Sequence, residues 1–328
     1  MGNAVLDPAT VHAVLSWANR APSVHNSQPW RWRVGPSTID LFADLSRALP
    51  TIDPDGRDLQ LSCGAALQHL QVALRAVGRS GDVRRLPDPS RPEHLATVEV
   101  RAVPSTAADL ALARVIDTRR TDRRVFSPRP VPAEVLDLLT SAAAEAGAEL
   151  RVLVPGEQWE VVGLIERAAV EQGFTPGLLE EVAAWSGRPR GAADGVPAAS
   201  VPGDVDAAVP VRYFAGHELE QSPLAVLESD GSVLALLHTA GDDPLDRLRA
   251  GEALGAVLLQ AELAGLATCP LTQPLEVADT RARLAADLLP EGRSPQVLLR
   301  LGWAPVGAAP LPRTGRRRVE ETISHGEG

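Results

Sequence analysis

The chain has 328 residues, 45% of them hydrophobic and 23% charged, and carries a net charge of −10. These values predict a globular protein with a sizeable core, usually divided into two domains. The negative charge argues against nucleic acid as the main partner, and no apolar run reaches the ~18 residues of a membrane span. No signal peptide is evident, and the two cysteines, Cys63 and Cys269, suit free thiols in a reducing cytoplasm.

The first hundred residues predict a helix, a β-hairpin, a long helix and a strand. Asp7 and Pro8 mark the start of the first helix, because Asp caps the free N–H groups of a first turn and Pro fits the first helical position. Hydrophobic residues alternate with other residues on both sides of the turn at Gly35 and Pro36, which is typical of a hairpin. After a loop-like stretch, we expect a helix over 59–78 and a strand over 96–103.

The rest of the chain predicts mostly helices. The expected helices cover 108–116, 132–142, 157–172, 175–187 and 251–265, and the expected strands cover 150–154 and 297–301. The segment 187–232 is rich in Gly, Pro and Ala. A stretch of this length without regular structure is usually a functional lid or a disordered insert, and the sequence leaves both open.

Two segments repeat one another at a constant offset of 187 residues. The stretch that begins Gly64-Ala-Ala-Leu aligns with the one that begins Gly251-Glu-Ala-Leu, and each ends at a glycine. A strand is expected after each of the two helices. This shared order indicates an internal duplication, with an N-terminal half over 1–107 and a C-terminal half over 108–328.

The stretch from Arg20 to Trp30 is the first candidate site. It is short and polar, and Pro22 and Pro29 stiffen it by fixing φ near both ends. Rigid polar loops on a packed scaffold commonly form binding sites, but an ordinary helix-to-strand connection uses the same residue types. Its candidate ligand-binding residues are Pro22, Ser23, His25, Asn26 and Gln28. For His25 a purely structural role is as well supported as ligand contact.

Arginine alone can provide an anion site here, because the chain has no lysine and all 32 of its Lys and Arg residues are Arg. The run 119–126 places four arginines within six residues. Each guanidinium can bind an anion through a bidentate, charge-assisted pair. Charge runs are also often solvated turns, and the tail arginines, Arg316 and Arg317, could equally belong to a disordered tail.

Two of these motifs resemble FMN-dependent nitroreductases. Residues 22–30, Pro-Ser-Val-His-Asn-Ser-Gln-Pro-Trp, are similar to the loop Pro-Ser-x-x-Asn-x-Gln-Pro-Trp that lies against the isoalloxazine ring in that family. The His before the Asn resembles the Acg-type branch of actinobacteria, in which two nitroreductase halves are fused. The run 119–126 resembles the phosphate motif Arg-Arg-Ser-x-Arg-x-Phe, with Thr121 in place of Ser and one extra residue before the Phe. The resemblance covers most of the chain and is weakest near 175–235.

The resemblance implies an α+β fold of two fused nitroreductase-like halves, with mixed, mainly antiparallel sheets flanked by helices. This pseudo-dimer would hold one FMN between its halves, because the first half carries the ring loop and the second the phosphate run. The segment 268–273 resembles the family's turn whose backbone N–H reaches the flavin N5 edge. Outside the ring loop, the implied FMN-binding residues are Arg119, Arg120, Arg123, Cys269, Pro270, Leu271, Arg316 and Arg317. As a thiol, Cys269 is expected to be structural rather than a nucleophile.

The implied function is hydride transfer from NAD(P)H through FMN to a nitroaromatic, a quinone or a similar acceptor. Because the flavin carries this chemistry, no catalytic side chain and no metal are expected. The alternatives are a flavin-sequestering storage protein closed by the segment 187–232, and a relic without flavin. The fused halves predict a monomer or a weak homodimer. The composition predicts a cytoplasmic protein with no nucleic acid or membrane partner.

Overall fold

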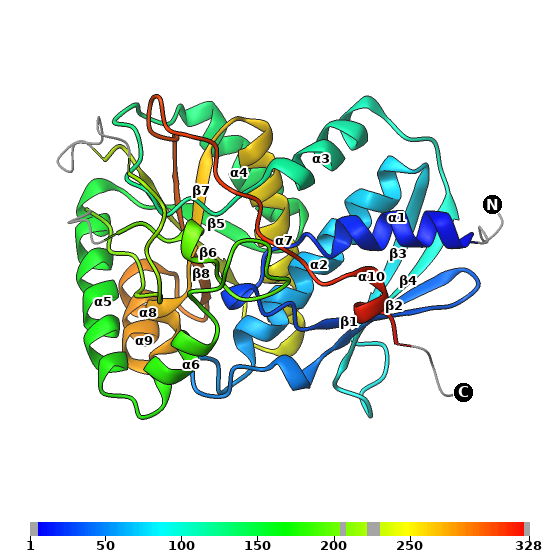
Figure 1. The fold of residues 1–328 in the computed structure, drawn as a ribbon, viewed down its shortest axis with the longest axis horizontal. Helices are drawn as coiled ribbons and strands as arrows, with labels where there is room; N and C mark the ends of the chain where they lie inside the picture. The colour runs from blue at the N-terminus through cyan, green and yellow to red at the C-terminus, as the bar shows by residue number, and fades with distance from the viewer. Residues whose placement is uncertain (1–5, 204–207, 222–229, 325–328) are drawn as a thin grey trace.

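The computed structural model describes residues 6–203, 208–221 and 230–324 and has an α+β fold with two four-stranded antiparallel sheets (Figure 1). The first sheet has the order β1-β2-β4-β3 and the second the order β5-β6-β8-β7. Each sheet therefore places its strands in the same order along the chain: first, second, fourth and third. The strands are β1 (Trp30–Val34), β2 (Thr38–Ala43), β3 (Arg79–Arg85), β4 (His94–Ala102), β5 (Glu149–Val152), β6 (Val233–Thr239), β7 (Ala267–Leu271) and β8 (Ser294–Gly302).

Helices surround and separate the sheets. They are α1 (Pro8–Ala18), α2 (Arg57–Ala76), α3 (Ala107–Thr118), α4 (Ala133–Glu145), α5 (Pro155–Gly173), α6 (Leu178–Ala184), α7 (Pro244–Leu263), α8 (Gln273–Glu276), α9 (Ala278–Leu288) and α10 (Val319–Thr322). Short 3-10 turns add η1 (Val24–Asn26), η2 (Leu45–Arg47) and η3 (Ala198–Ser200). In Figure 1 the paired helices α2 and α7 lie between the first sheet on the right and the second sheet on the left.

The helices α2 and α7 cross at two glycines. A Cβ added to Gly64 would lie 2.8 Å from the Cα of Gly251 and would also collide with the carbonyl oxygen of Leu248. A Cβ added to Gly251 would collide with the carbonyl oxygen of Leu61. The two backbones therefore meet directly, which only glycine permits at both positions. These are the two glycines that the repeat places in register.

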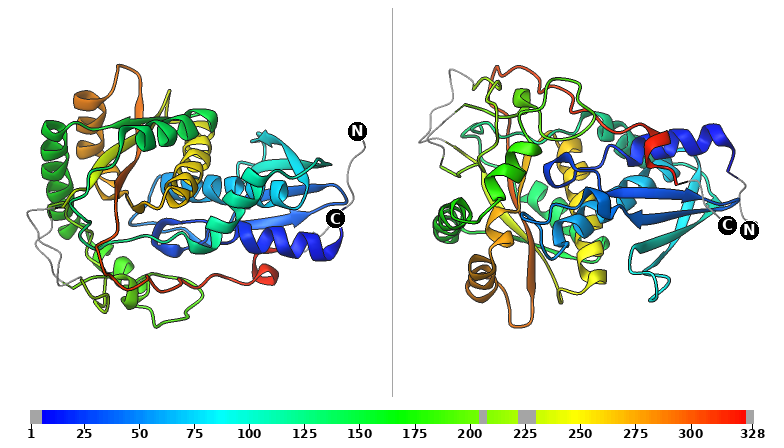
Figure 2. Two further views of the ribbon diagram at one scale, coloured as in Figure 1. Left: turned by 90° about the horizontal axis from the view of Figure 1, so that it is seen from above. Right: turned by 60° about the horizontal axis from the view of Figure 1, so that its bottom comes forward.

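The chain after β8 returns from the second half to the first (Figures 1 and 2). There Ile323 forms a parallel bridge with Trp32 of β1. The buried Asn19, which caps α1, connects the same region: its Oδ1 accepts from the indole N–H groups of Trp30 and Trp32 at 2.9 and 3.0 Å, and its Nδ2 donates to Thr322. The last residues of the chain thus hold the first helix and the hairpin together.

The structure corrects the expected elements at several points. The segment 268–273 is not a turn: β7 occupies Ala267–Leu271 and pairs with β8, and its edge position tolerates Pro270, which cannot donate to a ladder. β3 was missed because an edge strand of Arg, Ser, Gly and Asp shows little hydrophobic alternation. β6 and α9 were also missed, and α7 begins at Pro244 rather than near 251, with Asp243 as its cap.

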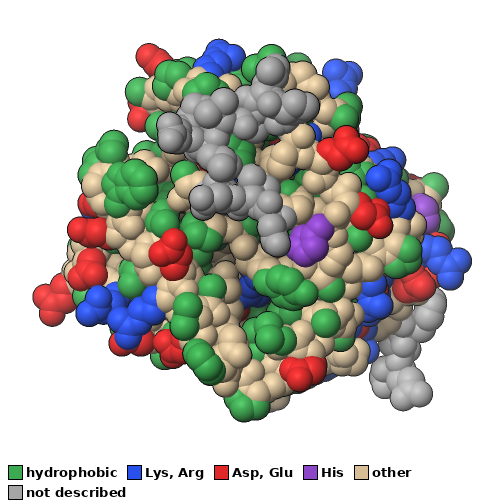
Figure 3. Space-filling model, turned by 60° about the vertical axis from the view of Figure 1, so that its left-hand side comes forward, with side chains coloured by type: hydrophobic (Ala, Val, Ile, Leu, Met, Phe, Trp, Pro, Cys, Tyr) green, Lys and Arg blue, Asp and Glu red, His purple; other side chains and the backbone are tan. Residues whose placement is uncertain are grey.

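The segment 187–232 contains the short turn η3 and otherwise irregular chain, and the parts of it over 204–207 and 222–229 lie outside the described residues. On the face of the second half in Figure 3, basic and acidic side chains are interspersed, with hydrophobic ones between them. Among the described residues, no helix combines the length and the apolar character needed to span a bilayer.

Replacement of Gly64 or Gly251 by Ala should lower the free energy of unfolding by about 2–3 kcal/mol, because the new methyl group meets backbone that cannot yield. Gly163, on the exposed side of α5, has no other atom within 4 Å of an added Cβ and provides the control. Gly163→Ala should be neutral or stabilising by up to about 1 kcal/mol, since Ala favours a helix over Gly. Urea denaturation of the three variants measures the difference; equal effects at all three positions would contradict a tight crossing.

Candidate functional site

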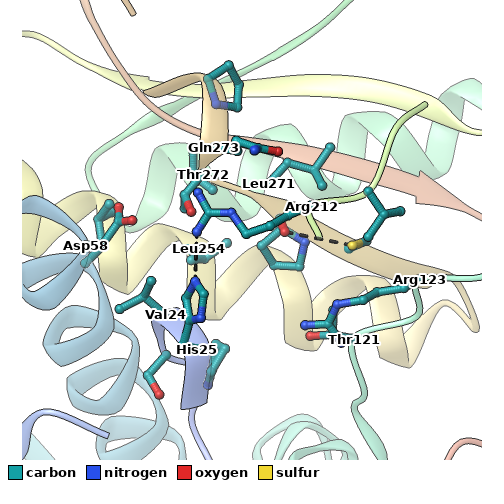
Figure 4. Close-up of a pocket in the computed structure, with 18 of the residues that line it drawn as sticks. Val24, His25, Asp58, Thr121, Arg123, Arg212, Leu254, Leu271, Thr272 and Gln273 are labelled. Atoms are coloured by element: carbon teal, nitrogen blue, oxygen red, sulfur yellow. Dashed lines mark hydrogen bonds between the residues drawn. The ribbon is translucent and has the colours of Figure 1, made fainter. Parts of the chain in front are cut away.

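Two adjoining cavities lie where the halves meet. One, the arginine lobe, is lined by Arg20, Arg119, Arg120, Arg123 and Arg316 among others. The second, the apolar lobe, has among its lining residues Val24, Leu61, Phe214, Leu254 and Leu271 (Figure 4). The lobes share Pro22, Ser23, His25, Thr121 and Arg123. A charged chamber therefore continues into an apolar one, and both are bordered by the polar loop that follows α1.

This polar loop has an unusual backbone. His25, Asn26 and Gln28 have φ values of 47°, 55° and 52°. These values lie in the left-handed region, which residues other than glycine rarely adopt. Hydrogen bonds hold this conformation: Ser23 Oγ accepts from the backbone N–H of Gln28 at 3.0 Å, and Ser62 Oγ on α2 accepts from that of Val24 at 3.1 Å. Strain maintained in this way is typical of functional sites.

Arg119 is the most isolated cation of the arginine lobe. It directly follows α3, its residue is 5% exposed, and its Nε and Nη1 atoms have no hydrogen-bond partner in the described part of the chain. Burial and the neighbouring Arg120 lower the pKa of Arg119 to about 10. Burial, followed by the charge of Arg119, also lowers the pKa of Arg316 well below its usual range. Buried cations without a counter-ion are costly, so the lobe is built for an anion.

The other arginines of the run 119–126 have different surroundings. Arg120 donates to the backbone oxygens of Asp117 and Arg119. Arg123 donates to Ser200 O at 3.2 Å and lies over the ring of Phe214 at 4.8 Å. Arg124, by contrast, forms a buried ion pair with Asp122 at 2.8 Å, so its charge is compensated within the protein.

The structure brings most of the predicted site residues together. Pro22, Ser23, His25, Asn26, Arg119, Arg120, Arg123, Cys269, Pro270, Leu271 and Arg316 line one or both lobes. Two predicted residues, Gln28 and Arg317, are absent from the lining. The Gln28 amide donates to Ala193 O and accepts from the backbone N–H of Arg317, whose guanidinium donates to Gln28 O and pairs with Asp44. These two residues therefore stabilise the polar loop from outside the cavities.

The described part of the segment 187–232 contacts the polar loop. Asn26 Nδ2 donates to Gly195 O at 3.1 Å, and Arg212 Nη1 lies 2.8 Å from His25 Nε2 (Figure 4). Because that nitrogen faces a guanidinium donor, His25 carries its ring proton on Nδ1. Burial and the charge of Arg212 hold the pKa of His25 well below its usual range, so the ring is neutral at physiological pH.

Sequence reasoning missed several residues of the apolar lobe. Arg212 and Asp58, which lies in the first turn of α2, both line the lobe. Arg212 also forms a buried ion pair with Glu276 of α8. None of the three belongs to a recognisable motif, and they come from segments far apart in sequence. The Cys269 thiol is buried, which raises its pKa and opposes a role as nucleophile. In the described residues, no group of three or more His, Cys, Asp or Glu side chains could hold a metal ion.

Comparisons with known proteins place the chain in a family. A model of the nitroreductase family matches residues 116–303. The provisionally named NAD(P)H nitroreductase Rv3131 of Mycobacterium tuberculosis is 45% identical over 318 residues, which cover 97% of this chain and 92% of that protein. The protein Acg of the same organism, named in the same way, is 33% identical over 330 residues, or 98% of each chain. The chain belongs to the nitroreductase family, and its resemblance to the Acg-type branch is confirmed.

Solved structures give weaker matches. An FMN-bound nitroreductase from Bacteroides fragilis is 17% identical, with a TM-score of 0.40, over 62% of this chain and 94% of its own. The FMN-dependent nitroreductase NfnB from Mycobacterium smegmatis, solved with NADPH, is 19% identical, with a TM-score of 0.40, over 66% of this chain and 98% of its own.

Inorganic phosphate should stabilise the ligand-free protein through Arg119. An anion at ~100 times its Kd raises the free energy of unfolding by about 3 kcal/mol. In Arg119→Met this gain should largely vanish, while the phosphate-free variant should be at least as stable as the wild type, because an uncompensated buried charge is removed. Thermal unfolding in phosphate and in chloride of equal ionic strength measures both effects. Arg313→Met, at an exposed arginine paired with Asp117, is the control and should keep the phosphate effect.

Acid should destabilise the protein through His69. This buried histidine of α2 has its pKa lowered to about 3 by burial and by the charge of Arg119, from an ordinary value of 6.5. As the pH falls, the unfolded chain takes up this proton before the folded chain does. The contribution of His69 to the free energy of unfolding is therefore fully present above pH 6.5 and is lost as the pH falls towards 3. His69→Gln should flatten this decline. His12→Gln, at an exposed position of α1, should leave it unchanged; equal acid profiles for His69→Gln and wild type would contradict the assignment.

Proposed function

We propose that this protein is an FMN-dependent oxidoreductase of the nitroreductase type, which transfers hydride from NAD(P)H through FMN to a nitroaromatic, a quinone or a similar acceptor. The observation that carries the proposal is the pair of adjoining cavities, one cationic and one apolar, which share five lining residues. FMN has matching ends, a phosphate and a flat ring. Family membership and the NAD(P)H nitroreductase names of the relatives support the same activity.

The unpartnered N–H groups of Arg119 fit a phosphate, since each can form a charge-assisted hydrogen bond with its oxygens. In this proposal the phosphate end is held by Arg119, Arg120, Arg123 and Arg316. The ring would lie against the strained loop, with Pro22, Ser23, His25 and Asn26 on one side and Cys269, Pro270 and Leu271 on the other. Gln28 and Arg317 would fix the loop from outside the cavity. When bound, FMN supplies the hydride acceptor and donor, and the chain supplies position, charge and exclusion of water.

We further propose that the chain arose by internal duplication and binds one FMN. The identical order of strands in the two sheets and the contact between Gly64 and Gly251 support two equivalent halves, over 1–107 and 108–328. The two motifs are divided between these halves, so one chain completes one site. The protein would then be active as a monomer or a weak homodimer, and a cytoplasmic location fits its buried free thiols.

A second function, flavin storage, is favoured by one observation. The described part of the segment 187–232 contacts the polar loop through Gly195 and Arg212, and Phe214 lies 5.3 Å from His25, between ring centres. If this segment remains closed over a bound flavin, neither a nicotinamide nor an acceptor can stack on the ring. Tight binding without turnover would follow.

Anaerobic titration of the purified protein with NADH and NADPH separates the two functions. A yellow protein whose visible flavin absorption is bleached by either nucleotide is the expected result for the oxidoreductase. A yellow protein that resists bleaching would establish storage instead. A colourless protein that takes up no added FMN would contradict both.

Arg119→Met and Arg123→Met should each weaken FMN binding by roughly 10- to 100-fold, because each removes a hydrogen-bonding charge from the phosphate end. Quenching of flavin fluorescence on binding measures the Kd. Arg313→Met keeps the cavity intact and should bind FMN like the wild type. Unchanged affinity in both cavity variants would count against the phosphate assignment.

A further inference from the structure

Asp58 is a buried acid in the lining of the apolar lobe. It lies in the first turn of α2, between the halves, and lines the lobe together with His25, Arg212 and Leu254 (Figure 4). Its residue is 5% exposed, and its Oδ2 atom has no hydrogen-bond partner among the described residues. A polar atom buried in this way is costly unless a ligand completes its hydrogen bonding.

The charges around Asp58 favour its neutral form. The two nearby cations already have other partners: Arg57 is paired with Asp242, and Arg212 is paired with Glu276. The other neighbour, Asp53, accepts from the backbone N–H of Leu59. Burial, followed by the charges of Asp53 and Glu276, raises the pKa of Asp58 well above its usual range, against the smaller effects of Arg212 and Arg57. These surroundings therefore favour the protonated carboxylic acid, which has one O–H to donate.

We propose that Asp58 is the proton donor of the apolar lobe, which hydrogen-bonds a carbonyl or nitro oxygen of the electron acceptor and protonates it during reduction. This inference rests on the proposed oxidoreductase function and adds a catalytic residue to it. The choice of an oxygen ligand follows from the site: an O–H donor in an otherwise largely apolar wall selects an acceptor that is flat and apolar with a polar oxygen at its edge.

The proton balance leaves one proton for a general acid to supply. A quinone becomes a hydroquinone by taking up two electrons and two protons. In the proposed function, hydride from the reduced flavin would bring both electrons and one proton to the quinone and would form one new bond to hydrogen there. The O–H bond of Asp58 breaks as the second proton moves to the acceptor oxygen, and the carboxylate then recovers a proton from solvent. General acids of this kind accelerate reactions roughly 100- to 10,000-fold.

Infrared spectroscopy tests the protonation state without turnover. The difference spectrum between wild type and Asp58→Asn at neutral pH should contain the carbonyl stretch of a protonated carboxylic acid, lost in the variant. Asp55→Asn, at an exposed acid just before α2 that is absent from the lining, is the matched control and should retain that band. A spectrum in which Asp58→Asn removes only the bands of an ionised carboxylate would overturn the proposal.

Stopped-flow kinetics test the donor role. The flavin is reduced first, with NADPH or with dithionite, and then mixed anaerobically with menadione. Asp58→Asn should slow re-oxidation by roughly 100-fold with little change in the concentration of menadione needed for half-saturation, because the amide still donates a hydrogen bond. Reduction by NADPH should match the wild type, and Asp55→Asn should behave like the wild type in both steps. Equal re-oxidation rates for Asp58→Asn and wild type would refute the donor role alone, whereas a wild type without flavin, or one that NADPH does not reduce, would refute the proposed oxidoreductase.

Discussion

Direct backbone contact between α2 and α7 is the constraint on which the rest of the structure depends. Gly64 and Gly251 allow the two longest helices to cross without intervening side chains, and this crossing joins the cores of the two halves. It also brings the first turn of α2 beside the second half, where Arg57 reaches Pro295 O and Gln296 Oε1 at 3.1 Å. The cavity lies next to this junction, so its dimensions follow from how closely the helices approach.

The arginine lobe illustrates the conflict between stability and binding. Burial of several guanidiniums without counter-ions lowers their pKa values and destabilises the flavin-free chain. In the proposed site, the phosphate of the ligand would compensate the same charges, so binding would offset the energy lost in folding. Arg124 shows the contrast within the same run: its charge is compensated by Asp122, and it is fixed in the structure rather than available to a ligand.

The apolar lobe is lined by segments that are far apart in the sequence and are held together by pairs of polar side chains. Arg212 connects the segment 187–232 to α8 through Glu276 and to the polar loop through His25. Arg212 is therefore engaged by these two side chains rather than by Asp58. Burial and the charges of Asp53 and Glu276 raise the pKa of Asp58, which favours its neutral form.

The sequence by itself determined the motifs and the main helices. The loop Pro22–Trp30 and the run 119–126 are each contiguous, and their residue types carry their chemistry directly, so the family and the polar-loop and arginine residues of the lining could be predicted from them. The alignment of Gly64 with Gly251 was visible in the sequence, and both glycines are needed because the two helix backbones touch there. Local pattern failed at the edge strands, where β3 is too polar and β7 contains a proline, since their hydrogen-bond partners rather than their own side chains define them.

Only the tertiary structure decided which polar groups face the cavity. Gln28 and Arg317 belong to the predicted motifs but turn towards each other, whereas Asp58, Arg212 and Glu276 belong to no motif and meet in space. Ionisation is likewise a property of the fold. The pKa of a buried Asp or Arg depends on which charges surround it, and those charges come from segments that only folding brings together.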